Sequence, residues 1–216
     1  MTSRYKVVIY DCDGVLLDSI ESNYIFYNRI MKGLGRPEID RLCSESERVL
    51  HTFSYLDVIE HFFGKDPQKE QAIAIGKTIR YKELMPYMRR EEGLVETLTT
   101  LKGKVELAIC TNRAASMEMI IEDFGLEGFF GCIMTAGKVA NPKPHPEPLL
   151  KVLEHYGIGP QEALFVGDSA VDMQAAAAAG IPFIAYKSDL PALAVIERHE
   201  QVLEYVLRKK LQLTTD

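Results

Sequence analysis

The sequence predicts an α/β fold: a doubly wound parallel sheet with a helical domain inserted after the first strand. Five apolar runs have the composition of buried strands, and they lie near residues 6–10, 105–110, 131–135, 164–167 and 182–186. Helical spacing marks the segments between most of them, at residues 91–101, 113–124, 146–156 and 170–179. Strands that alternate with helices favour a parallel sheet covered by helices, in which ligands bind beyond the carboxyl ends of the strands.

One interval breaks this alternation and predicts a second domain. No convincing strand lies between residues 18 and 88, and the helical patterns there run over residues 19–33, 40–63 and 67–84. We therefore expect a core domain of residues 1–17 and 86–216 and a helical cap domain of residues 18–85. Because the cap follows the first strand directly, it is well placed to act as a lid over a site at the strand ends.

Composition and charge exclude several classes of protein. The 216 residues suffice for a sizeable buried core, and a net charge of −6 argues against a nucleic-acid binder. No apolar run approaches the roughly 20 residues of a membrane-spanning helix, and no signal-peptide pattern opens the chain. The cysteines have no CxxC spacing, which indicates reduced thiols and no zinc site: Cys12, Cys43, Cys110 and Cys132. We expect a cytoplasmic protein, monomer or homodimer, that binds neither nucleic acid nor membrane.

The most informative residues are Asp11 and Asp13, which follow the apolar run 7–10 and precede Gly14. Side chains alternate along an extended backbone, so the two carboxylates can project to the same side. Like charges that close are costly unless a cation compensates them or one carboxylate takes up a proton. The pair therefore fits a metal site or a nucleophile beside a proton donor, although a plain polar strand exit has the same pattern.

Two later segments carry polar residues at points where the chain leaves regular structure. Thr111 and Asn112 follow an apolar strand, where the N-terminus of the next helix would offer backbone N–H groups to an anion. A simple helix cap explains the same pattern. Lys143 lies among alternating prolines, which hold its stem near the backbone and suit it to bind a phosphate or a carboxylate. His145 reads as a turn residue without a catalytic role.

A last strand end brings two more carboxylates. Asp168 follows an apolar run, and Asp172 lies one helical turn later, so the two can face the same space. This spacing suits oxygen ligation of Mg²⁺, a hard cation that takes carboxylates and retains several waters. Capping boxes give a structural reading: Ser169 with Asp172 here, and Asp18 with Glu21 at the start of the cap.

These motifs, in this order and at strand ends, resemble those of the haloacid dehalogenase (HAD) superfamily of phosphohydrolases. They are Asp11-x-Asp13-Gly14, Thr111, Lys143-Pro144 and Gly167-Asp168-Ser169 with Asp172, over a core of residues 4–17 and 89–190. The helical insertion resembles the superfamily's C1 cap, and the whole chain is most similar to the phosphoglycolate phosphatase-like branch. The resemblance implies a Rossmann-like core and a phosphoric monoester hydrolase that acts on a small phosphorylated metabolite, phosphoglycolate-like or a sugar phosphate monoester.

The resemblance also implies which residues carry the reaction. Asp11 would be the nucleophile that forms an aspartyl-phosphate, and Asp13 would protonate the leaving alkoxide and then deprotonate the hydrolytic water. Substrate phosphate would be bound by three groups: Thr111, the Asn112 amide and Lys143. Positive charge from a metal and a lysine would offset the repulsion between a phosphate dianion and an anionic aspartate.

The same resemblance implies Mg²⁺ as the cofactor. Its ligands would be Asp11, the backbone carbonyl of Asp13 and the carboxylate of Asp168, with Asp172 adjacent or in contact with these ligands. Selectivity would come from polar residues in or near the cap, and the candidates are Asn23, His51, Arg80, Tyr81, Arg89 and Arg90.

One departure from the branch leaves an alternative open. Val15 stands where these phosphatases most often have Thr, and β-phosphoglucomutase-like phosphomutases commonly carry Val there. Those mutases usually also have a His shortly afterwards, and residues 18–23 contain none, which favours hydrolysis. Dehalogenation is disfavoured because it does not need the second aspartate, Asp13.

Three readings from other classes are more remote. A receiver-type signalling module shares the acidic pocket but is much shorter and lacks the helical insertion. A non-catalytic protein that binds a phosphorylated ligand would not need the full set of catalytic residues. A dinucleotide-binding enzyme is disfavoured because no GxGxxG follows any strand.

Overall fold

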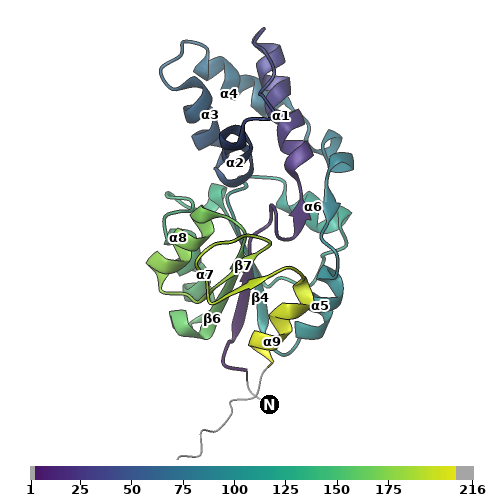
Figure 1. Ribbon diagram of the computed structural model, residues 1–216, viewed down its shortest axis with the longest axis vertical. Helices are drawn as coiled ribbons and strands as arrows, with labels where there is room; N and C mark the ends of the chain where they lie inside the picture. The colour runs from purple at the N-terminus through teal and green to yellow at the C-terminus, as the bar shows by residue number, and fades with distance from the viewer. Residues whose placement is uncertain (1–2, 208–216) are drawn as a thin grey trace, which may run out of the picture.

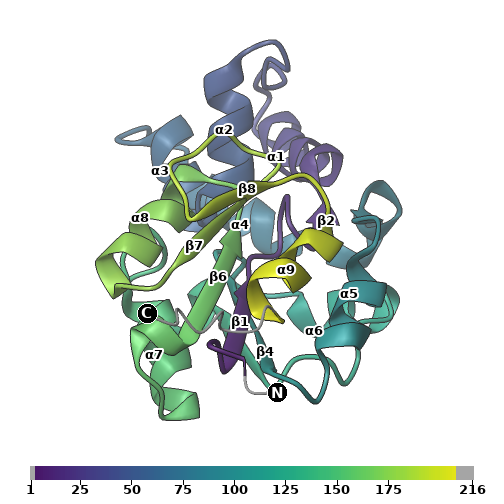
Figure 2. The ribbon, with the colours of Figure 1, turned by 60° about the horizontal axis from the view of Figure 1, so that its bottom comes forward.

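The structure is a computed structural model, and it describes residues 3–207. Its centre is a six-stranded parallel sheet with the order β5-β4-β1-β6-β7-β8 (Figure 2). The strands are β1 (Val7–Tyr10), β4 (Glu106–Thr111), β5 (Cys132–Thr135), β6 (Ala163–Gly167), β7 (Phe183–Tyr186) and β8 (Ala194–Ile196). This confirms the predicted fold class, including all five predicted strands; the short edge strand β8 was not foreseen.

Helices cover both faces of the sheet. The central strand β1 is accordingly apolar at every position. Val8 and Tyr10 face one helical layer, and Val7 and Ile9 face the other, as the alternation of side chains along a strand requires. The first layer contains α5 (Leu94–Leu101), α6 (Met117–Asp123) and α9 (Val202–Val206). The second contains α7 (Glu147–Tyr156) and α8 (Ala170–Ala179). Short 3₁₀ turns complete the core: Ala136–Lys138, Pro160–Glu162 and His199–Gln201.

The segment after β1 forms a helical cap beyond one end of the sheet, at the top of Figure 1. Its helices are α1 (Ile20–Gly33), α2 (Ser44–Thr52), α3 (Tyr55–Phe63) and α4 (Lys69–Thr78), followed by 3₁₀ turns at Tyr81–Glu83 and Met85–Tyr87. The cap has its own apolar cluster, which includes Ile30, Val58 and Ile59. It therefore folds around a core separate from those beside the sheet.

Two expectations for the cap helices are wrong in detail. The helix expected over residues 40–63 is two helices, because Phe53 is extended and Ser54 caps α3, its hydroxyl accepting from the Asp57 N–H at 3.4 Å. The capping box expected at Asp18 is absent, and no side chain caps α1. Asp18 is instead extended in a short strand that pairs with Arg89.

That pairing joins the two places where the chain passes between core and cap. Strand β2 (Leu17–Asp18) lies antiparallel to β3 (Arg89–Arg90), with Leu17 opposite Arg90. The predicted domain boundaries, 17/18 and 85/86, fall at or just before these strands. Residues 1–2 and 208–216 of the predicted core domain lie outside the described residues.

Within residues 3–207, none of the helices has the length and apolar character that spanning a bilayer demands. All four cysteines are free, and three of them are buried: Cys12, Cys110 and Cys132. Burial raises the pKa of Cys110 to about 12, so this thiol is protonated at neutral pH.

Candidate functional site

The site lies at the carboxyl end of β1, which has β4 beside it on one side and β6, from later in the chain, on the other. This is the switch point at which doubly wound sheets bind ligands. Asp11 directly follows β1, and its N–H donates to the Val166 carbonyl at 2.9 Å, so the strand pairing extends to the carboxylate. Thr111 ends β4 and Asp168 follows β6, so the topology brings three of the predicted residues to one edge.

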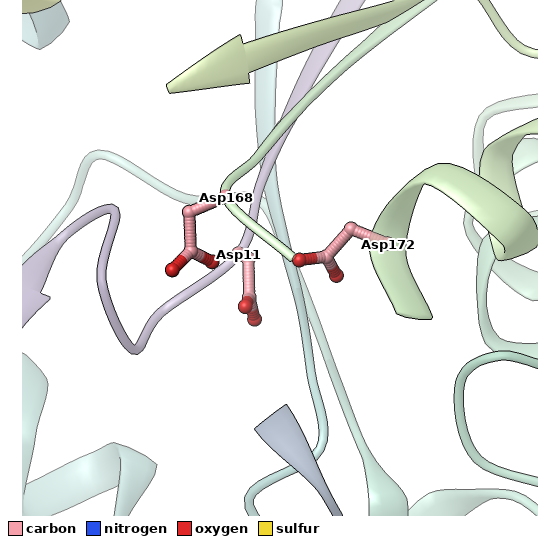
Figure 3. Close-up of side chains that lie close together, drawn as sticks. All are labelled: Asp11, Asp168 and Asp172. Atoms are coloured by element: carbon pink, nitrogen blue, oxygen red, sulfur yellow. The ribbon is translucent and has the colours of Figure 1, made fainter. Parts of the chain in front are cut away.

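Three predicted acidic residues gather at this edge. Oxygen atoms of Asp11, Asp168 and Asp172 lie within 4.8 Å of one another, and the side chains converge from β1, the β6–α8 turn and the first turn of α8 (Figure 3). Burial, together with the Asp172 carboxylate, raises the pKa of Asp11 to about 8, against the opposing effect of Lys143. Burial also raises the pKa of Asp168. Such a cluster favours either a proton or a hard divalent cation.

Lys143 is buried beside the cluster. Its ammonium lies 2.8 Å from Asp11 Oδ1 and 2.6 Å from Asp172 Oδ1, and it donates to the Cys110 carbonyl at 2.9 Å. Burial by itself would lower the pKa of Lys143, but Asp11 and Asp172 hold that pKa above its usual value. A permanent positive charge therefore stands directly beside Asp11.

Asp172 is held in place by the start of its own helix. The Ser169 hydroxyl donates to Asp172 Oδ2 at 2.5 Å and accepts from the Asp172 N–H at 3.3 Å, which is the expected capping box. One oxygen of Asp172 thus serves Ser169 while the other serves Lys143. Asp172 therefore caps its own helix and contacts Lys143 at the same time.

Asp13 lies in the same pocket, but its carboxylate is engaged elsewhere. Arg113 donates from Nε to Asp13 Oδ2 at 2.7 Å and from its terminal nitrogen to Oδ1, and the Ser19 hydroxyl also donates to Oδ1. Burial alone would raise the pKa of Asp13, but the guanidinium holds that pKa below its usual range. Asp13 is therefore ionised in this conformation, and its side chain is not among the three that cluster for a cation.

Thr111 and Asn112 line the pocket with Asp11, but the helix predicted from residue 113 begins only at Met117. Arg113 is tied to the core, because its carbonyl accepts from the Ala136 N–H at 2.9 Å while its side chain binds Asp13. The predicted anion site at a helix N-terminus is therefore wrong in its geometry. A loop presents these two residues instead.

Asn112 has a further role, because its side chain links cap and core. The amide donates to the carbonyl of Thr52, the last residue of α2, at 3.1 Å and to the Lys143 carbonyl at 2.9 Å. His51, from the same helix, places Nε2 at 3.4 Å from Asp168 Oδ2. Burial disfavours the charged ring, but Asp168 outweighs it and raises the pKa of His51 to about 9.

Gly14 permits this close approach of cap and core. It has φ of +76°, a conformation that suits glycine. A Cβ at this position would also collide with the carboxylate of Asp168 and the ring of His51. The glycine of the first motif is therefore required both by its backbone angle and by the two side chains packed on it.

The candidate selectivity residues divide into two groups. Asn23, His51 and Tyr81 line the pocket. The three arginines do not: the Arg80 side chain is exposed and pairs with Glu83, Arg89 is exposed in β3, and Arg90 donates to the Phe124 carbonyl of the core.

Val15, the departure from the branch pattern, is fully buried in the core and does not line the pocket. Its carbonyl lies 2.8 Å from Nε2 of His199, a buried ring from the C-terminal part of the chain. Val15 therefore packs in the core and not in the pocket, and the phosphomutase alternative stays as the sequence left it.

Sequence reasoning missed Arg113 and Ser19, and it treated His51 only as one of several lid candidates. The sequence held one signal for Arg113: it is a basic residue directly after Thr111-Asn112, and Asp11 and Asp13 were predicted to lie at the same edge of the sheet. His51 carried no such signal, because its approach to Asp168 depends on how α2 packs over the sheet.

Known proteins resemble this chain in sequence and in fold. Residues 8–186 match the family of haloacid dehalogenase-like hydrolases. A phosphoglycolate phosphatase of Pseudomonas putida is 31% identical over 183 residues, which is 82% of this chain and 67% of that protein. A phosphoglycolate phosphatase of Aquifex aeolicus is 25% identical over 221 residues, covering 96% of this chain and 94% of that one.

A crystal structure of a HAD-superfamily hydrolase, subfamily IA, variant 1, from Geobacter sulfurreducens is 53% identical. It superposes with a TM-score of 0.76 and covers 94% of this chain and 96% of its own. These relatives confirm the resemblance that the four motifs indicated. The chain belongs to the haloacid dehalogenase-like hydrolase family.

Proposed function

We propose that this protein is a Mg²⁺-dependent phosphatase that hydrolyses a small phosphorylated metabolite through an aspartyl-phosphate at Asp11. One observation carries the proposal: Asp11 ends the central strand with Lys143 at 2.8 Å and with Asp168 and Asp172 within 4.8 Å. A nucleophilic carboxylate, a fixed positive charge and oxygen ligands for a hard cation thus stand at one point. The family and the named phosphoglycolate phosphatases support a phosphoric monoester hydrolase, as the sequence predicted.

The residues fit a magnesium ion. Asp11, Asp168 and Asp172 supply only carboxylate oxygens, the donors that Mg²⁺ prefers, and the backbone carbonyl of Asp13 is the further ligand that the family resemblance implies. Without a cation, burial favours the protonated form of Asp11, which is a poor nucleophile. When bound, the ion would offset the charge of the phosphate and keep Asp11 ionised.

The chain's own groups then account for both halves of the reaction. An oxygen of Asp11 attacks phosphorus, the bond to the leaving alkoxide breaks, and Asp13 supplies the proton that this alkoxide needs. In the second half, Asp13 takes a proton from the water that attacks the aspartyl-phosphate, which releases inorganic phosphate and restores Asp11. Lys143, Thr111 and the backbone amide of Asn112 would bind the phosphoryl oxygens.

Arg113 has two consequences for Asp13. It keeps the carboxylate ionised, which suits the step in which Asp13 accepts a proton from water. A phosphate dianion entering the pocket would compete for the guanidinium and repel the carboxylate, and both effects favour protonation of Asp13 before the first step.

The test is phosphate release by the purified protein from a panel of small phosphate esters, with Mg²⁺ and with EDTA. We expect metal-dependent release that is abolished in Asp11→Asn, whose folding is checked by circular dichroism and thermal melting. Substantial turnover by a folded Asp11→Asn protein would exclude Asp11 as the nucleophile. A cytoplasmic location and a monomeric or homodimeric state remain predictions.

A further inference from the structure

The pocket above Asp11 and Asp13 is much more aromatic than a phosphate site requires. A cavity of about 330 Å³ opens between core and cap, at the low end of the roughly 300–1,000 Å³ typical of small-molecule sites. Beyond the catalytic groups, its walls are mainly cap side chains: Phe26, Tyr27, Leu50, Phe53, Tyr55, Ile79, Tyr81 and Leu84. The part of a substrate that is not phosphate must lie against this surface.

One side of the pocket is a set of three rings that fix each other. Phe26 packs edge-on against Tyr27 and Tyr55, with ring centres 5.0 Å and 5.9 Å apart. The Tyr55 hydroxyl donates to the Ile73 carbonyl at 3.1 Å, so its polar end is already satisfied. A Cβ on Gly76 would strike the Tyr55 hydroxyl, so the absence of a side chain there lets α4 close on this ring.

The remaining rings are backed by cations. The Arg48 guanidinium lies 5.2 Å from the ring centre of Phe53, and that of Arg113 lies 5.2 Å from the ring centre of Tyr81. Both contacts hold aromatic surface in position. Arg113 also donates to Asp13, so a second anion could bind it only in competition with that carboxylate.

Three arginines of the cap are engaged in ion pairs outside the pocket. Ion pairs engage Arg29 with Glu83, Arg36 with Asp66, and Arg41 with Glu21. Among described residues, the cations that line the pocket are Arg113, His51 beside Asp168, and Lys77 at its exposed edge. The buried cations of the pocket are already paired, Arg113 with Asp13 and His51 with Asp168. A carboxylate among the aromatic walls would therefore lack a free counter-charge, and burying an unpaired charge is costly.

We propose that the alcohol part of the natural substrate is uncharged and carries a flat, largely apolar ring, in contrast to the two-carbon carboxylate of phosphoglycolate. The inference rests on the proposed phosphatase function and specifies its substrate class. The ring packs between Phe53 and the set formed by Phe26, Tyr27 and Tyr55, while the phosphate lies against Asp11 and Lys143.

The experiment compares three monophosphate esters of primary alcohols: 2-phenylethyl phosphate, ethyl phosphate and phosphoglycolate. The first two release alcohols of similar acidity, so a difference in kcat/KM between them reports contact with the ring. Because a buried aromatic ring strengthens binding substantially, we expect kcat/KM for 2-phenylethyl phosphate to exceed the other two by about tenfold or more.

Variants test whether cap residues cause the preference for 2-phenylethyl phosphate over ethyl phosphate. Phe53→Ala should reduce the ratio of kcat/KM for 2-phenylethyl phosphate over ethyl phosphate by about fivefold, because it removes one wall of the ring site. The matched control is Leu56→Ala, an exposed residue of α3 that does not line the pocket, and it should leave the ratio unchanged. Lys77→Met tests the competing reading, in which Lys77 binds a carboxylate.

The outcomes separate this inference from the proposed function. If phosphoglycolate has the highest kcat/KM and loses it in Lys77→Met, the phosphatase stands and the inference is overturned. If none of the three esters is hydrolysed, calorimetry with 2-phenylethylphosphonate and ethylphosphonate decides. Tighter binding of the phenyl compound would then uphold the ring site, while the wider ester panel decides the phosphatase proposal. Equal or absent binding would overturn the ring site.

Discussion

Arg113 donates two hydrogen bonds to the carboxylate of Asp13, although the two residues are 100 positions apart in the sequence. The planar guanidinium fits both oxygens at once, which an ammonium cannot do. It therefore fixes the orientation of Asp13 and its ionisation state together.

Replacing Arg113 with Met should affect esters according to how much their leaving groups need a proton. We expect turnover of ethyl phosphate to fall by about tenfold or more, because Asp13 loses the guanidinium that orients it and so is less well placed to protonate the alkoxide. Turnover of 4-nitrophenyl phosphate should fall less, since its phenolate leaves unaided. Steady-state assays on both esters check this, with the exposed Arg89→Met as control. Equal losses on both esters would mean that Arg113 acts on the phosphate or on the second half of the reaction, and not on protonation of the alkoxide.

Replacing Asp13 with Asn should leave the first half of the reaction possible only for good leaving groups. We expect a burst of about one equivalent of 4-nitrophenolate, followed by little turnover, because no base then activates water against the aspartyl-phosphate. Rapid-mix absorbance measurements detect the burst. Asn keeps the shape of the side chain beside the buried Arg113 better than Ala does, so the variant is the more stable choice. Steady turnover at the wild-type rate would contradict a role for Asp13 in proton transfer.

Magnesium should stabilise the folded protein as well as support turnover. A cation bound only by the native carboxylates adds about 2.7 kcal/mol to the free energy of unfolding when its concentration is about 100 times Kd. We expect EDTA to lower the melting temperature and Mg²⁺ to restore it. The shift should nearly vanish in Asp168→Asn and persist in Asp123→Asn, which alters an exposed carboxylate on α6. A melting temperature indifferent to Mg²⁺ in the wild-type protein would rule out the proposed site.

His199 should make stability depend on pH. Burial lowers its pKa from 6.5 to about 4, so the unfolded chain binds more protons than the folded one between these values. The stabilisation is complete above pH 6.5 and is lost as pH falls toward 4, by about 3 kcal/mol in total at 1.36 kcal/mol for each pKa unit. Urea unfolding of wild type and His199→Phe across this range gives the difference.

The exposed His155→Gln serves as the control for that series and should follow the wild-type curve. His199→Phe should be less stable at pH 7, because the Val15 carbonyl loses its partner, yet show a flatter pH profile. Parallel profiles for wild type and His199→Phe would show that this ring does not titrate in the range.

The core was readable from the sequence because its signals are local. Continuous apolar runs such as residues 7–10 are typical of buried parallel strands, and the polar residues that end them were predicted to meet at one edge. Asp11, Thr111 and Asp168 do meet there. The capping box of Ser169 and Asp172 was also local enough to predict.

The features that the sequence did not predict depend on contacts between segments far apart in the chain. Hydrogen bonds to Asp13 and Ala136 hold Arg113 outside α6, which therefore starts late. Helical spacing alone does not predict these long-range hydrogen bonds. The position of His51 depends on the docking of α2 over the sheet. The sequence also could not predict which polar cap residues line the pocket, because helical spacing does not show which face of a helix meets the core.

The chain passes between core and cap at two places, and the pairing of β2 with β3 joins them into one two-stranded ribbon. A two-stranded ribbon bends across its flat face more easily than within its plane, so the cap is expected to swing mainly in one direction. His51 and Thr52, at the end of α2, would then leave Asp168 and Asn112 in the same movement. If the proposed reaction holds, the same opening would release the alcohol and admit the hydrolytic water, so the second chemical step would wait for departure of the first product.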